Sequence, residues 1–484
     1  MFRGGLLPAF PIVMDIPDQV LSLAERVRSE GGRALLVGGC VRDELMGRPP
    51  KDWDVEIYGI EPARLRELLD RFGTVNVVGE AFTVYKLGPH LDLSLPRRER
   101  KTGRGHRAFF IDGDPEMTVE EAVTRRDFTI NAIMQDALTG EIIDPGNGRT
   151  DLQRGIIRAV SPGTFSDDSL RVLRAAQFAA RFEFRVEPET VALCRAIDLS
   201  DLPSERIWGE MEKLLLRAQH PSIGLGWLHA LGVLDQLFPE IKALIEVPQD
   251  PEWHPEGDVF VHTRLVIDRA HELIGDLPYA KQVTVMLAAL AHDFGKPRTT
   301  EFIDGRLRSR GHEEAGVDPT LNFLNRLNIH TLEGYDVRAQ VLALVRDHLK
   351  PGEFFKKREE VGDGAFRRLA RKCELDLLYR VAKADSLGRN AEWIPREKWY
   401  DATAQEWFIE RARELDVVSQ APAPILLGRH LLEMGLSPGP RVGEITRAVY
   451  EMQLDGRVKT LDEAKEVAKE MISTDYADYT DRKN

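Results

Sequence analysis

Apolar and polar positions follow two patterns along this chain, first a mixture of helical and strand periodicity and then an almost wholly helical one. Residues 17–30 carry apolar side chains at helical spacing, and residues 31–39 indicate a turn that leads into a buried strand. Short helices and strands then alternate: a helix at 41–47, a strand at 51–59, a helix at 61–73 and strands within 75–88 and 90–99. The first hundred residues therefore predict a small sheet accompanied by helices.

The pattern becomes almost wholly helical from about residue 119. Apolar side chains recur every three to four residues in five segments: 119–134, 169–184, 189–197, 204–218 and 223–241. A loop rich in proline and acids at 247–258 precedes a second helical block, and a helical tail begins near residue 400. We expect an elongated, multidomain α+β protein in four parts: 1–145, 146–240, 241–398 and 399–484.

Length and composition fit a soluble multidomain protein. The 484 residues exceed what one compact core usually supports, and 43% hydrophobic with 30% charged residues is typical of globular chains. Prolines and an acid interrupt the apolar N-terminal stretch, no cleavage site follows it, and no apolar run reaches membrane-spanning length. We expect a cytoplasmic protein without membrane contact. Its three widely separated cysteines predict neither a disulfide framework nor a zinc site.

The net charge of −13 argues on average against nucleic-acid binding, because phosphate contacts need lysine and arginine. The distribution of charge weakens this argument. Six arginines or lysines gather with a single acid at 97–107, and five more arginines follow between residues 125 and 158. Such a zone attracts anions over about 8–10 Å even on an acidic protein.

Two carboxylates stand at alternate positions of the predicted strand 51–59. Asp54 and Glu56 therefore project from one side of the strand, close enough to share divalent metal. Oxygen ligands suit Mg²⁺, and two such ions about 3.5–4 Å apart can clamp the oxygens of a phosphoryl displacement. Taken alone, the pair also fits a solvated strand face.

A turn just upstream strengthens the metal interpretation. Gly38, Gly39, Arg42 and Asp43 lie where a buried strand passes into a helix. Bare backbone amides and a helix N-terminus at such a turn favour phosphate. An ordinary strand–turn–helix junction has the same pattern, so only the nearby carboxylates make it a candidate triphosphate site.

The stretch LLVGGCVRDELMGRPPKDWDVEIYG resembles the head motif of the class II nucleotidyltransferases of the polymerase beta superfamily. This group holds the tRNA CCA-adding enzymes and bacterial poly(A) polymerases. RRDFTINAI at 125–133, DPGNGRTDLQRGIIRAV at 144–160 and FSDDSLRVLRAAQFAARFEF at 165–184 resemble its next motifs in the same order. The resemblance covers roughly the first 215 residues and implies a nucleotidyltransferase head at 1–145 and a helical neck at 146–240.

The resemblance also implies roles for individual residues. Asp54 and Glu56 would be catalytic and hold Mg²⁺, and Asp92 is the candidate for a third carboxylate. The incoming nucleotide would be bound by Gly38, Gly39, Arg42, Asp43, Arg125, Arg126, Asp127, Asn131, Asp168, Arg171 and Arg174.

Asp168 and Arg171 occupy the places that read the Watson–Crick edge of the incoming base in this family. Their i, i+3 spacing puts them on one helix face. The carboxylate accepts from an exocyclic amine and the guanidinium donates to a ring acceptor, so the pair suits C and A. Asp167 stands where the family has glutamate and has a shorter reach, and Glu56 stands where aspartate is common. The basic loop at 101–114 resembles a mobile segment that helps the switch from C to A addition.

Histidines and aspartates gather in the second helical block, which holds most of the chain's twelve histidines. The candidate ligands are separated by helix lengths and include one adjacent pair: His262, His292, Asp293, His312, His348 and Asp385. Imidazole and carboxylate ligands suit transition metals or Mg²⁺, with positions left for water.

The series H, HD, D, with Lys296 after the pair, resembles the HD phosphohydrolase superfamily. It implies one divalent ion, Mg²⁺, Mn²⁺ or Ni²⁺, on His262, His292, Asp293 and Asp385, and a second ion on His312 and His348. The implied activity is hydrolysis of a phosphomonoester or a 2',3'-cyclic phosphodiester by metal-activated water. A degenerate site that only stabilises the helical domain is the alternative.

Both resemblances together predict an enzyme that adds CCA to tRNA 3' ends from CTP and ATP, with an HD domain that could trim or repair damaged ends. The head motifs leave open an enzyme that adds only A, only CC, or poly(A). A phosphohydrolase whose head merely binds nucleotide is the alternative of another class, and the presence of all the head's acids and arginines argues against it. The tail at 399–484 resembles the RNA-binding C-terminal segment of longer family members.

Overall fold

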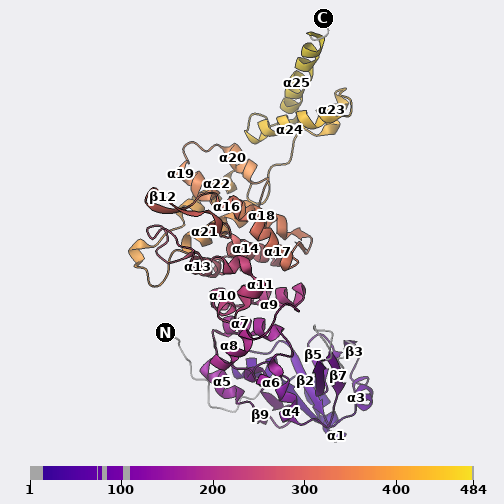
Figure 1. Ribbon diagram of the computed structural model, residues 1–484. Helices are drawn as coiled ribbons and strands as arrows, with labels where there is room; N and C mark the ends of the chain where they lie inside the picture. The colour runs from indigo at the N-terminus through magenta and orange to yellow at the C-terminus, as the bar shows by residue number, and fades with distance from the viewer. Residues whose placement is uncertain (1–14, 74, 79–83, 102–108, 482–484) are drawn as a thin grey trace. The chain divides into compact units, whose positions relative to one another are not determined.

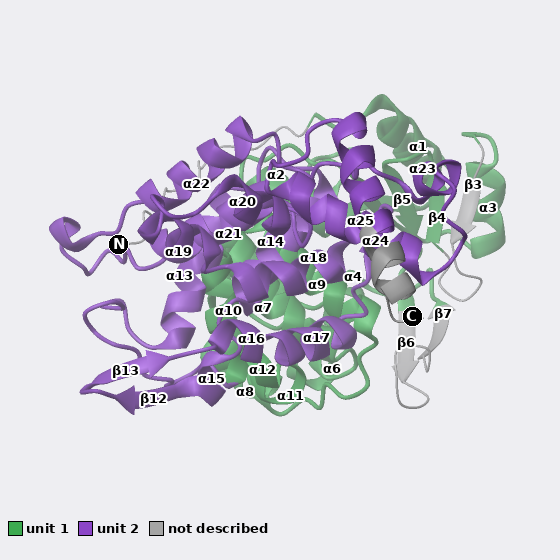
Figure 2. Cartoon of the chain, turned by 90° about the horizontal axis from the view of Figure 1, so that it is seen from above, with its two compact units in different colours: residues 1–242 green, residues 243–484 purple. Residues whose placement is uncertain are grey.

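The computed structural model describes residues 15–73, 75–78, 84–101 and 109–481. The chain forms two compact units, residues 1–242 and 243–484 (Figure 2). The predictions for the extreme N-terminus and for the tip of the basic loop, residues 102–108, fall outside the described residues. No helix among the described residues is long and apolar enough to cross a membrane.

The first unit contains a seven-stranded sheet in the order β3-β4-β5-β2-β1-β8-β9 (Figure 1). Its strands are β1 (Arg33–Val37), β2 (Trp53–Tyr58), β3 (Val75–Val78), β4 (Val84–Leu87), β5 (Leu91–Ser94), β8 (Met134–Asp136) and β9 (Ile142–Ile143). A separate antiparallel hairpin consists of β6 (Arg97–Lys101) and β7 (Phe109–Gly113). The helices that accompany the sheet are α1 (Asp18–Ser29), α2 (Gly39–Leu45), α3 (Pro62–Leu69), α4 (Val119–Thr124) and α5 (Gly148–Arg154).

The register of the central strands places the predicted acids. β2 pairs with β1 antiparallel and with β5 parallel, and Asp54 stands directly beside Asp92 of β5. Apolar residues fill the intervening positions, since Val55 and Ile57 are buried. The alternation of a strand therefore sends Asp54 and Glu56 to the opposite face from these core residues.

The segment 119–134 was predicted as one helix, and this is wrong. The helix α4 ends at Thr124, a 3-10 turn spans Thr129–Asn131, and β8 begins at Met134. Asp127 accepts hydrogen bonds from the backbone N–H of Phe128 and from the side chain of Asn131, so polar side chains replace helical bonds here. Pairing of β8 with β1 then takes the apolar end of the segment into the sheet.

Helices follow the sheet in the first unit. They are α6 (Pro162–Phe165), α7 (Leu170–Phe182), α8 (Pro188–Arg195), α9 (Ser204–Arg217), α10 (Pro221–Ala230), α11 (Val233–Leu237) and α12 (Pro239–Lys242). Two short strands, β10 (Ile156–Ile157) and β11 (Arg185–Val186), pair in parallel beside them. The helix α7 packs against both α9 and α10, and its apolar side chains are buried nearly throughout.

The second unit is helical apart from two small hairpins. Its first helices are α13 (Val259–Glu272), α14 (Tyr279–Ala291), α15 (Lys296–Thr299), α16 (His312–Ala315), α17 (Val317–Arg326) and α18 (Val337–Asp347). These are followed by α19 (Lys350–Lys356), α20 (Asp363–Leu369), α21 (Leu375–Leu387), the 3-10 turn Arg396–Lys398 and α22 (Thr403–Glu414). The hairpins are β12 (Thr300–Ile303) with β13 (Arg306–Ser309), and β14 (Thr331–Leu332) with β15 (Tyr335–Asp336).

The helix α14 is the central element of this unit. Every residue from Val283 to Ala291 is buried, as expected for a helix with neighbours on all sides. It packs against α13, α18 and α21. His292 and Asp293 follow directly, so the buried helix carries the His-Asp pair into the interior.

The C-terminal helices have a core of their own. They are α23 (Gly428–Glu433), α24 (Pro440–Leu454) and α25 (Leu461–Asp481), and their core includes Leu431, Ile445 and Ala464. The predicted α+β region followed by helical parts is confirmed. The division into four parts stays a prediction. α22, which begins just after residue 399, packs against α19 and α21 of the histidine block.

Candidate functional site

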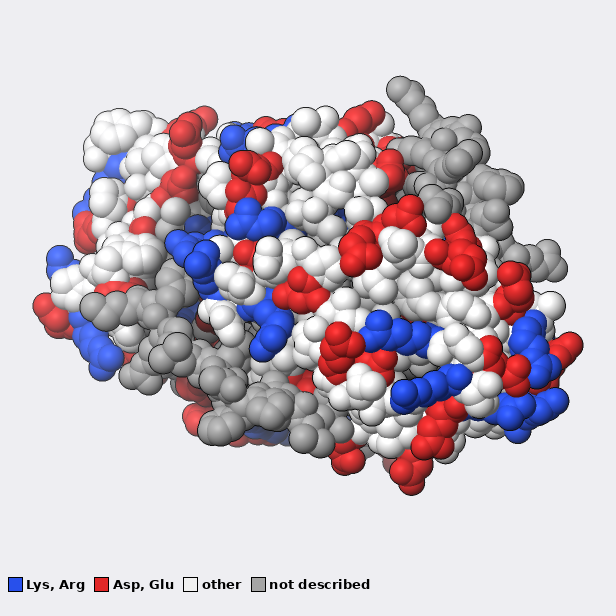
Figure 3. Space-filling model, turned by 90° about the horizontal axis from the view of Figure 1, so that it is seen from below, with Lys and Arg blue, Asp and Glu red and all other residues white. Residues whose placement is uncertain are grey.

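A polar cleft of about 470 Å³ in the first unit brings the predicted nucleotide residues together. Nine cationic side chains line it against three acids. The cations are Arg42, Arg97, Arg125, Arg126, Arg171, Arg174, Arg181, Lys213 and Arg217, and the acids are Asp54, Asp127 and Asp168. Such an excess of positive charge suits a polyanion. Acidic and basic side chains are interspersed on the face drawn in Figure 3.

The turn between β1 and α2 forms one wall of the cleft. Gly38 has φ +71°, and a Cβ at this position would lie 3.6 Å from Arg126 Nη1 and 3.9 Å from Asp54 Oδ2. Glycine therefore keeps the backbone open toward these charged groups. Asp43 does not line the cleft, since its carboxylate accepts from Arg42 at 2.6 and 2.8 Å and holds that guanidinium in place.

The two predicted metal ligands have different surroundings. Asp54 is exposed at the cleft, and enclosure together with the neighbouring Asp92 raises its pKa. Lys86 donates to Asp92 at 3.0 Å. Lys86 offsets part of the repulsion between the two carboxylates, and their oxygens are also of the kind that a divalent ion prefers.

Glu56 is fully buried and lies within a group of arginines. Arg125 and Arg126 form ion pairs with its two oxygens, and the hydroxyl of Tyr58 donates to Oε2 at 2.9 Å. Burial raises the pKa of Glu56, but the two arginines outweigh burial and lower it. Metal binding by Glu56 therefore requires these arginines to turn away, and its role as a ligand stays a prediction.

A chain of hydrogen bonds connects the turn to the helices. Arg42 donates to Asn131, Asn131 donates to Asp127 at 3.0 Å, and Arg174 donates to Asp127 at 2.8 Å. Arg42 also lies over the ring of Phe182 at 4.8 Å. Both ends of this chain line the cleft, which fixes the predicted residues of three separate motifs in one place.

The predicted base-reading pair, Asp168 and Arg171, forms hydrogen bonds with other groups of the protein. Arg206 of α9 binds Asp168 through two hydrogen bonds, of 2.9 and 3.1 Å. Arg171 donates to the backbone carbonyls of Thr164 and Arg125. Sequence reasoning missed Arg206, because its 38-residue separation from Asp168 leaves no local signal. An incoming base must therefore replace or share these contacts.

Four histidines and two aspartates of the second unit meet in its interior, as predicted. All six residues are buried. His262 Nε2 lies 3.1 Å from Asp385 and 3.9 Å from Asp293, and His292 Nε2 lies 3.1 Å from Asp293. Three groups of ligand atoms here are close enough for an ion: His254, Glu256 and His262; His262, His292 and Asp293; and Asp293, His312 and His348. Among the residues that the structure describes, no other groups of three qualify.

The donor atoms of this site fit a cation. Three ring Nδ1 atoms donate to backbone carbonyls: His292 to Ala289, His312 to Ser309 and His348 to Val345. Their Nε2 atoms are therefore lone-pair acceptors, yet those of His312 and His348 face each other at 3.2 Å. His292 Nε2 and Asp293 Oδ1 also lack a hydrogen-bond partner, whereas Asp293 Oδ2 forms an ion pair with Lys296. Facing lone pairs and an unpartnered carboxylate oxygen are stabilised by a metal ion.

The pKa shifts of His348 and Asp293 favour the forms that bind metal. The shift of His262 has the opposite sense, because burial lowers its pKa but Asp385 and Glu256 outweigh burial and raise it. Burial, with His312 and His292 nearby, lowers the pKa of His348 to about 3. Burial raises the pKa of Asp293, but His292 and Lys296 outweigh it and hold the pKa well below its usual range. Neutral imidazole and ionised carboxylate are the forms that bind metal.

A cavity of about 210 Å³ opens onto the histidine cluster. Lys296 and Arg389 line it beside Asp293 and Asp385, and the half-exposed ring of Trp253 lines its wall. Lys296 Nζ lies 2.7 Å from Asp293 and donates to Gln249. The cavity thus has the size and charge to admit a phosphate ester next to the cluster.

Family models match three regions of the chain. A family model described as poly A polymerase head domain matches residues 34–158. Models described as probable RNA and SrmB-binding site of polymerase A and as HD domain match residues 183–245 and 259–390.

The fold is shared with solved CCA-adding enzymes. The Thermotoga maritima CCA-adding enzyme complexed with tRNA has a TM-score of 0.58 at 18% identity, over 95% of this chain and 98% of that chain. An apo CCA-adding enzyme has a TM-score of 0.61 at 20% identity over 96% of both chains.

Two curated relatives are more similar in sequence. The multifunctional CCA protein of Nitrosococcus oceani is 40% identical over 365 residues, which is 73% of this chain and 84% of the relative. That of Xanthomonas campestris pathovar campestris is 38% identical over 425 residues, which is 84% of this chain and 95% of the relative. This chain is a member of the family of multifunctional CCA proteins, class II nucleotidyltransferases with an HD domain.

Proposed function

We propose that this protein completes the 3' end of tRNA by adding CCA from CTP and ATP. The observation that carries the proposal is the cationic cleft, which joins the Gly38 turn, the exposed Asp54 and the Asp168–Arg171 pair in one pocket. The relatives named multifunctional CCA protein and the CCA-adding enzymes solved with CTP, ATP and tRNA support the same activity.

Different residues of the cleft bind the metal ion and the triphosphate in this proposal. Mg²⁺ held by Asp54, with Glu56 and Asp92 nearby, would neutralise phosphate charge and activate the attacking 3' hydroxyl. The backbone at Gly38 and Gly39 and the guanidinium of Arg42 bind the triphosphate, because they line the cleft beside Asp54. Arg125 and Arg126 leave Glu56 for the phosphates, which present a larger negative charge.

Base selection belongs to Asp168 and Arg171. The carboxylate of Asp168 accepts from the amine of C or A once one of its two hydrogen bonds from Arg206 is broken. Arg171 donates to the adjacent ring acceptor of the base. G and U present a carbonyl where C and A present an amine, so each leaves Asp168 facing an acceptor. The pair therefore favours CTP and ATP.

The histidine site supports a second activity, hydrolysis of a phosphomonoester or a 2',3'-cyclic phosphodiester at an RNA end. His262, His292, Asp293 and Asp385 would hold Mg²⁺, Mn²⁺ or Ni²⁺, with His312 and His348 available to a second ion, and such an ion supplies activated water. Lys296 and Arg389 orient the phosphate, and the ring of Trp253 offers a stacking surface to a base. The C-terminal helices would bind RNA, and the site of action would be the cytoplasm.

The deciding experiment measures incorporation of labelled CTP and ATP into three tRNAs, which lack CCA, CA or A. A CCA-adding enzyme extends all three. An A-adding enzyme extends only the tRNA that ends in CC, and a CC-adding enzyme leaves that substrate unchanged. Failure to extend any of the three would overturn the transferase proposal and leave the metal-dependent phosphohydrolase with a nucleotide-binding head.

A further inference from the structure

His262 differs from the other histidines of the metal site in how its ring is held. The other three donate Nδ1–H to the carbonyl of the residue three positions earlier in the chain, at 2.8, 2.7 and 2.6 Å. His262 is the fourth residue of α13, and its Nδ1 lies 2.7 Å from Oε1 of Glu256 instead. One carboxylate thus stands where the others have a backbone oxygen.

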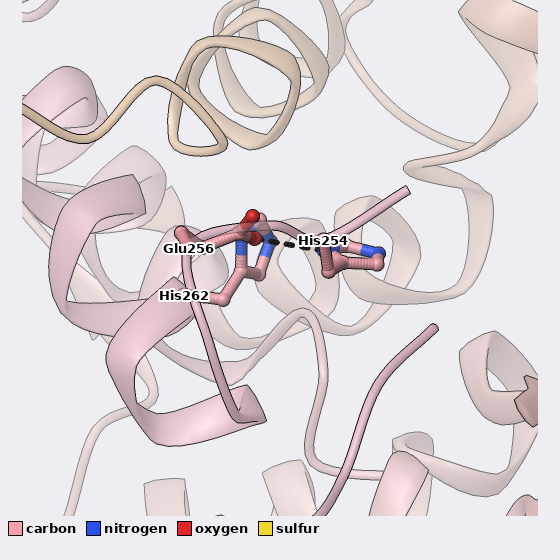
Figure 4. Close-up of side chains that lie close together, drawn as sticks. All are labelled: His254, Glu256 and His262. Carbon is pink, nitrogen blue, oxygen red and sulfur yellow. Dashed lines mark hydrogen bonds and ion pairs between the residues drawn. The ribbon is translucent and has the colours of Figure 1, made fainter. Parts of the chain in front are cut away.

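Glu256 is itself buried and held from a second side. Its side chain is 0% exposed, and its Oε1 also accepts from Nδ1 of His254 at 2.8 Å (Figure 4). The contact from His262 Nδ1 to Oε1 is short but does not have hydrogen-bond geometry, and Glu256 Oε2 has no hydrogen-bond partner among the described residues. A small rotation of either group completes the bond.

The contacts of Glu256 with the two histidines are shorter than the separation expected between two ligands of one ion. Two atoms that each lie about 2.1 Å from one ion are about 3.0–3.4 Å apart. His262 Nε2 lies 3.1 Å from Oδ1 of Asp385, a distance that suits a shared ion and also a hydrogen bond when no ion is bound, and it lies 3.9 Å from Asp293. The contacts of Glu256, 2.7 and 2.8 Å, have hydrogen-bond length.

We propose that Glu256 is a positioning residue for the metal site. Its carboxylate accepts Nδ1–H of His262, which fixes the tautomer whose Nε2 lone pair faces Asp293 and Asp385. A carboxylate partner also makes the ring a stronger electron donor to a metal ion, and His254 keeps the carboxylate in place. The inference rests on the proposed metal-dependent function of this site.

The first test measures Mn²⁺ binding to the full-length protein by titration calorimetry. Glu256→Ala is expected to weaken binding by about 10–100-fold, as partners of ligating histidines usually do. Glu256→Gln retains a neutral acceptor of the same size and should restore part of the affinity. Glu252→Gln is the matched control, because this acid of the same loop is exposed and pairs with Arg306.

The second test reads the tautomer of His262 in metal-free protein from ¹⁵N chemical shifts of histidine-labelled samples. The wild type and the Glu252→Gln control should show Nδ1–H at His262. Glu256→Ala should shift the ring toward Nε2–H, and Glu256→Gln should preserve Nδ1–H. A residue that only fills space would leave the tautomer unchanged, and circular dichroism checks that each variant is folded.

Three outcomes would overturn the proposal. Unchanged Mn²⁺ affinity in folded Glu256→Ala is one, and an unchanged tautomer is another. Loss of one whole bound ion, with unaltered affinity for the rest, would make Glu256 a ligand of a separate site.

If the wild type binds Mn²⁺ but hydrolyses no phosphate ester, the proposed function fails while the positioning role of Glu256 stands. If the wild type binds no Mn²⁺, the tautomer measurement decides the inference alone.

Discussion

The cleft of the first unit and the histidine site of the second have opposite charge imbalances. Nine cations crowd the cleft around three acids, so the cleft is incomplete without an anion. The histidine site is buried and presents lone pairs to lone pairs, as at His312 and His348, so it is incomplete without a cation. From the sign of the mismatch we infer the kind of partner that each site would bind: a polyphosphate in the cleft and a metal ion in the histidine site.

The comparison predicts that a mutation in one site abolishes its own activity, nucleotide incorporation or phosphate ester hydrolysis, and leaves the other activity unchanged. Asp54→Ala should lower CTP and ATP incorporation by more than about a thousandfold, because no neighbouring acid of the cleft is both exposed and beside the triphosphate turn. Hydrolysis of 2',3'-cyclic AMP should be unchanged. Asp52→Asn is the control, since Asp52 is exposed and contacts His90, and it should retain incorporation. Extension of tRNA by the Asp54 variant would show that the metal assignment is wrong.

The complementary experiment removes two of the predicted metal ligands from the histidine site. His292→Ala combined with Asp293→Asn should abolish hydrolysis of the cyclic nucleotide and Mn²⁺ binding, because both residues belong to the buried ligand group. Incorporation of CTP into tRNA should continue at the wild-type rate. A parallel loss of both activities, in protein that remains folded, would mean that the sites are not independent.

Packing beside each site offers a third, smaller effect. A Cβ at Gly295 would lie 2.0 Å from the carbonyl oxygen of His312, and one at Gly148 would lie 2.1 Å from that of Thr129. Gly295→Ala and Gly148→Ala should each destabilise their unit by about 2–4 kcal/mol. Thermal unfolding with both activities as probes would show which site fails first.

Gly352→Ala is the control for both glycine variants. This glycine lies in α19 with nothing within 4 Å of an added Cβ, so alanine should raise stability by about 0.5–1 kcal/mol. Equal destabilisation by all three variants would contradict the steric explanation.

The smallest effect concerns base selection within the cleft. Arg206→Ala removes the bidentate partner of Asp168, so we expect about a tenfold rise in KM for CTP and ATP together with increased incorporation of UTP. Arg206→Lys keeps the positive charge but not the two parallel hydrogen bonds. Its KM and its UTP incorporation should therefore lie between those of the wild type and Arg206→Ala. Misincorporation equal to the wild type would show that Asp168 does not depend on Arg206.

Local motifs were predictable because their residues are close in sequence. The Gly38 turn, the Asp54 position and the His292–Asp293 pair needed only strand or helix periodicity and a resemblance, and the structure brings each into a site. The spacing in the segment 119–134 indicated a helix, but side chains such as Asp127 bind the backbone there and end it.

Contacts between distant segments were not predictable in the same way. Arg206 and Glu256 had no motif to mark them, and each acts through a partner on another element or turn. The burial of Glu56 under Arg125 is a further case, since strand alternation gives the side of the sheet but not what covers it.

The hydrogen bond from Arg171 to the backbone carbonyl of Arg125 would have a kinetic consequence if both residues have the roles proposed above. Arg125 also forms an ion pair with Glu56, which is two residues from Asp54. A short series of contacts therefore connects the proposed base-reading residue to the proposed site of phosphate chemistry. If Arg171 reads the base as proposed, a base that fits badly would displace the backbone of Arg125, whose guanidinium is proposed to bind phosphate. Errors would then be rejected partly through a slow chemical step, and fidelity would be visible in kcat as well as in KM.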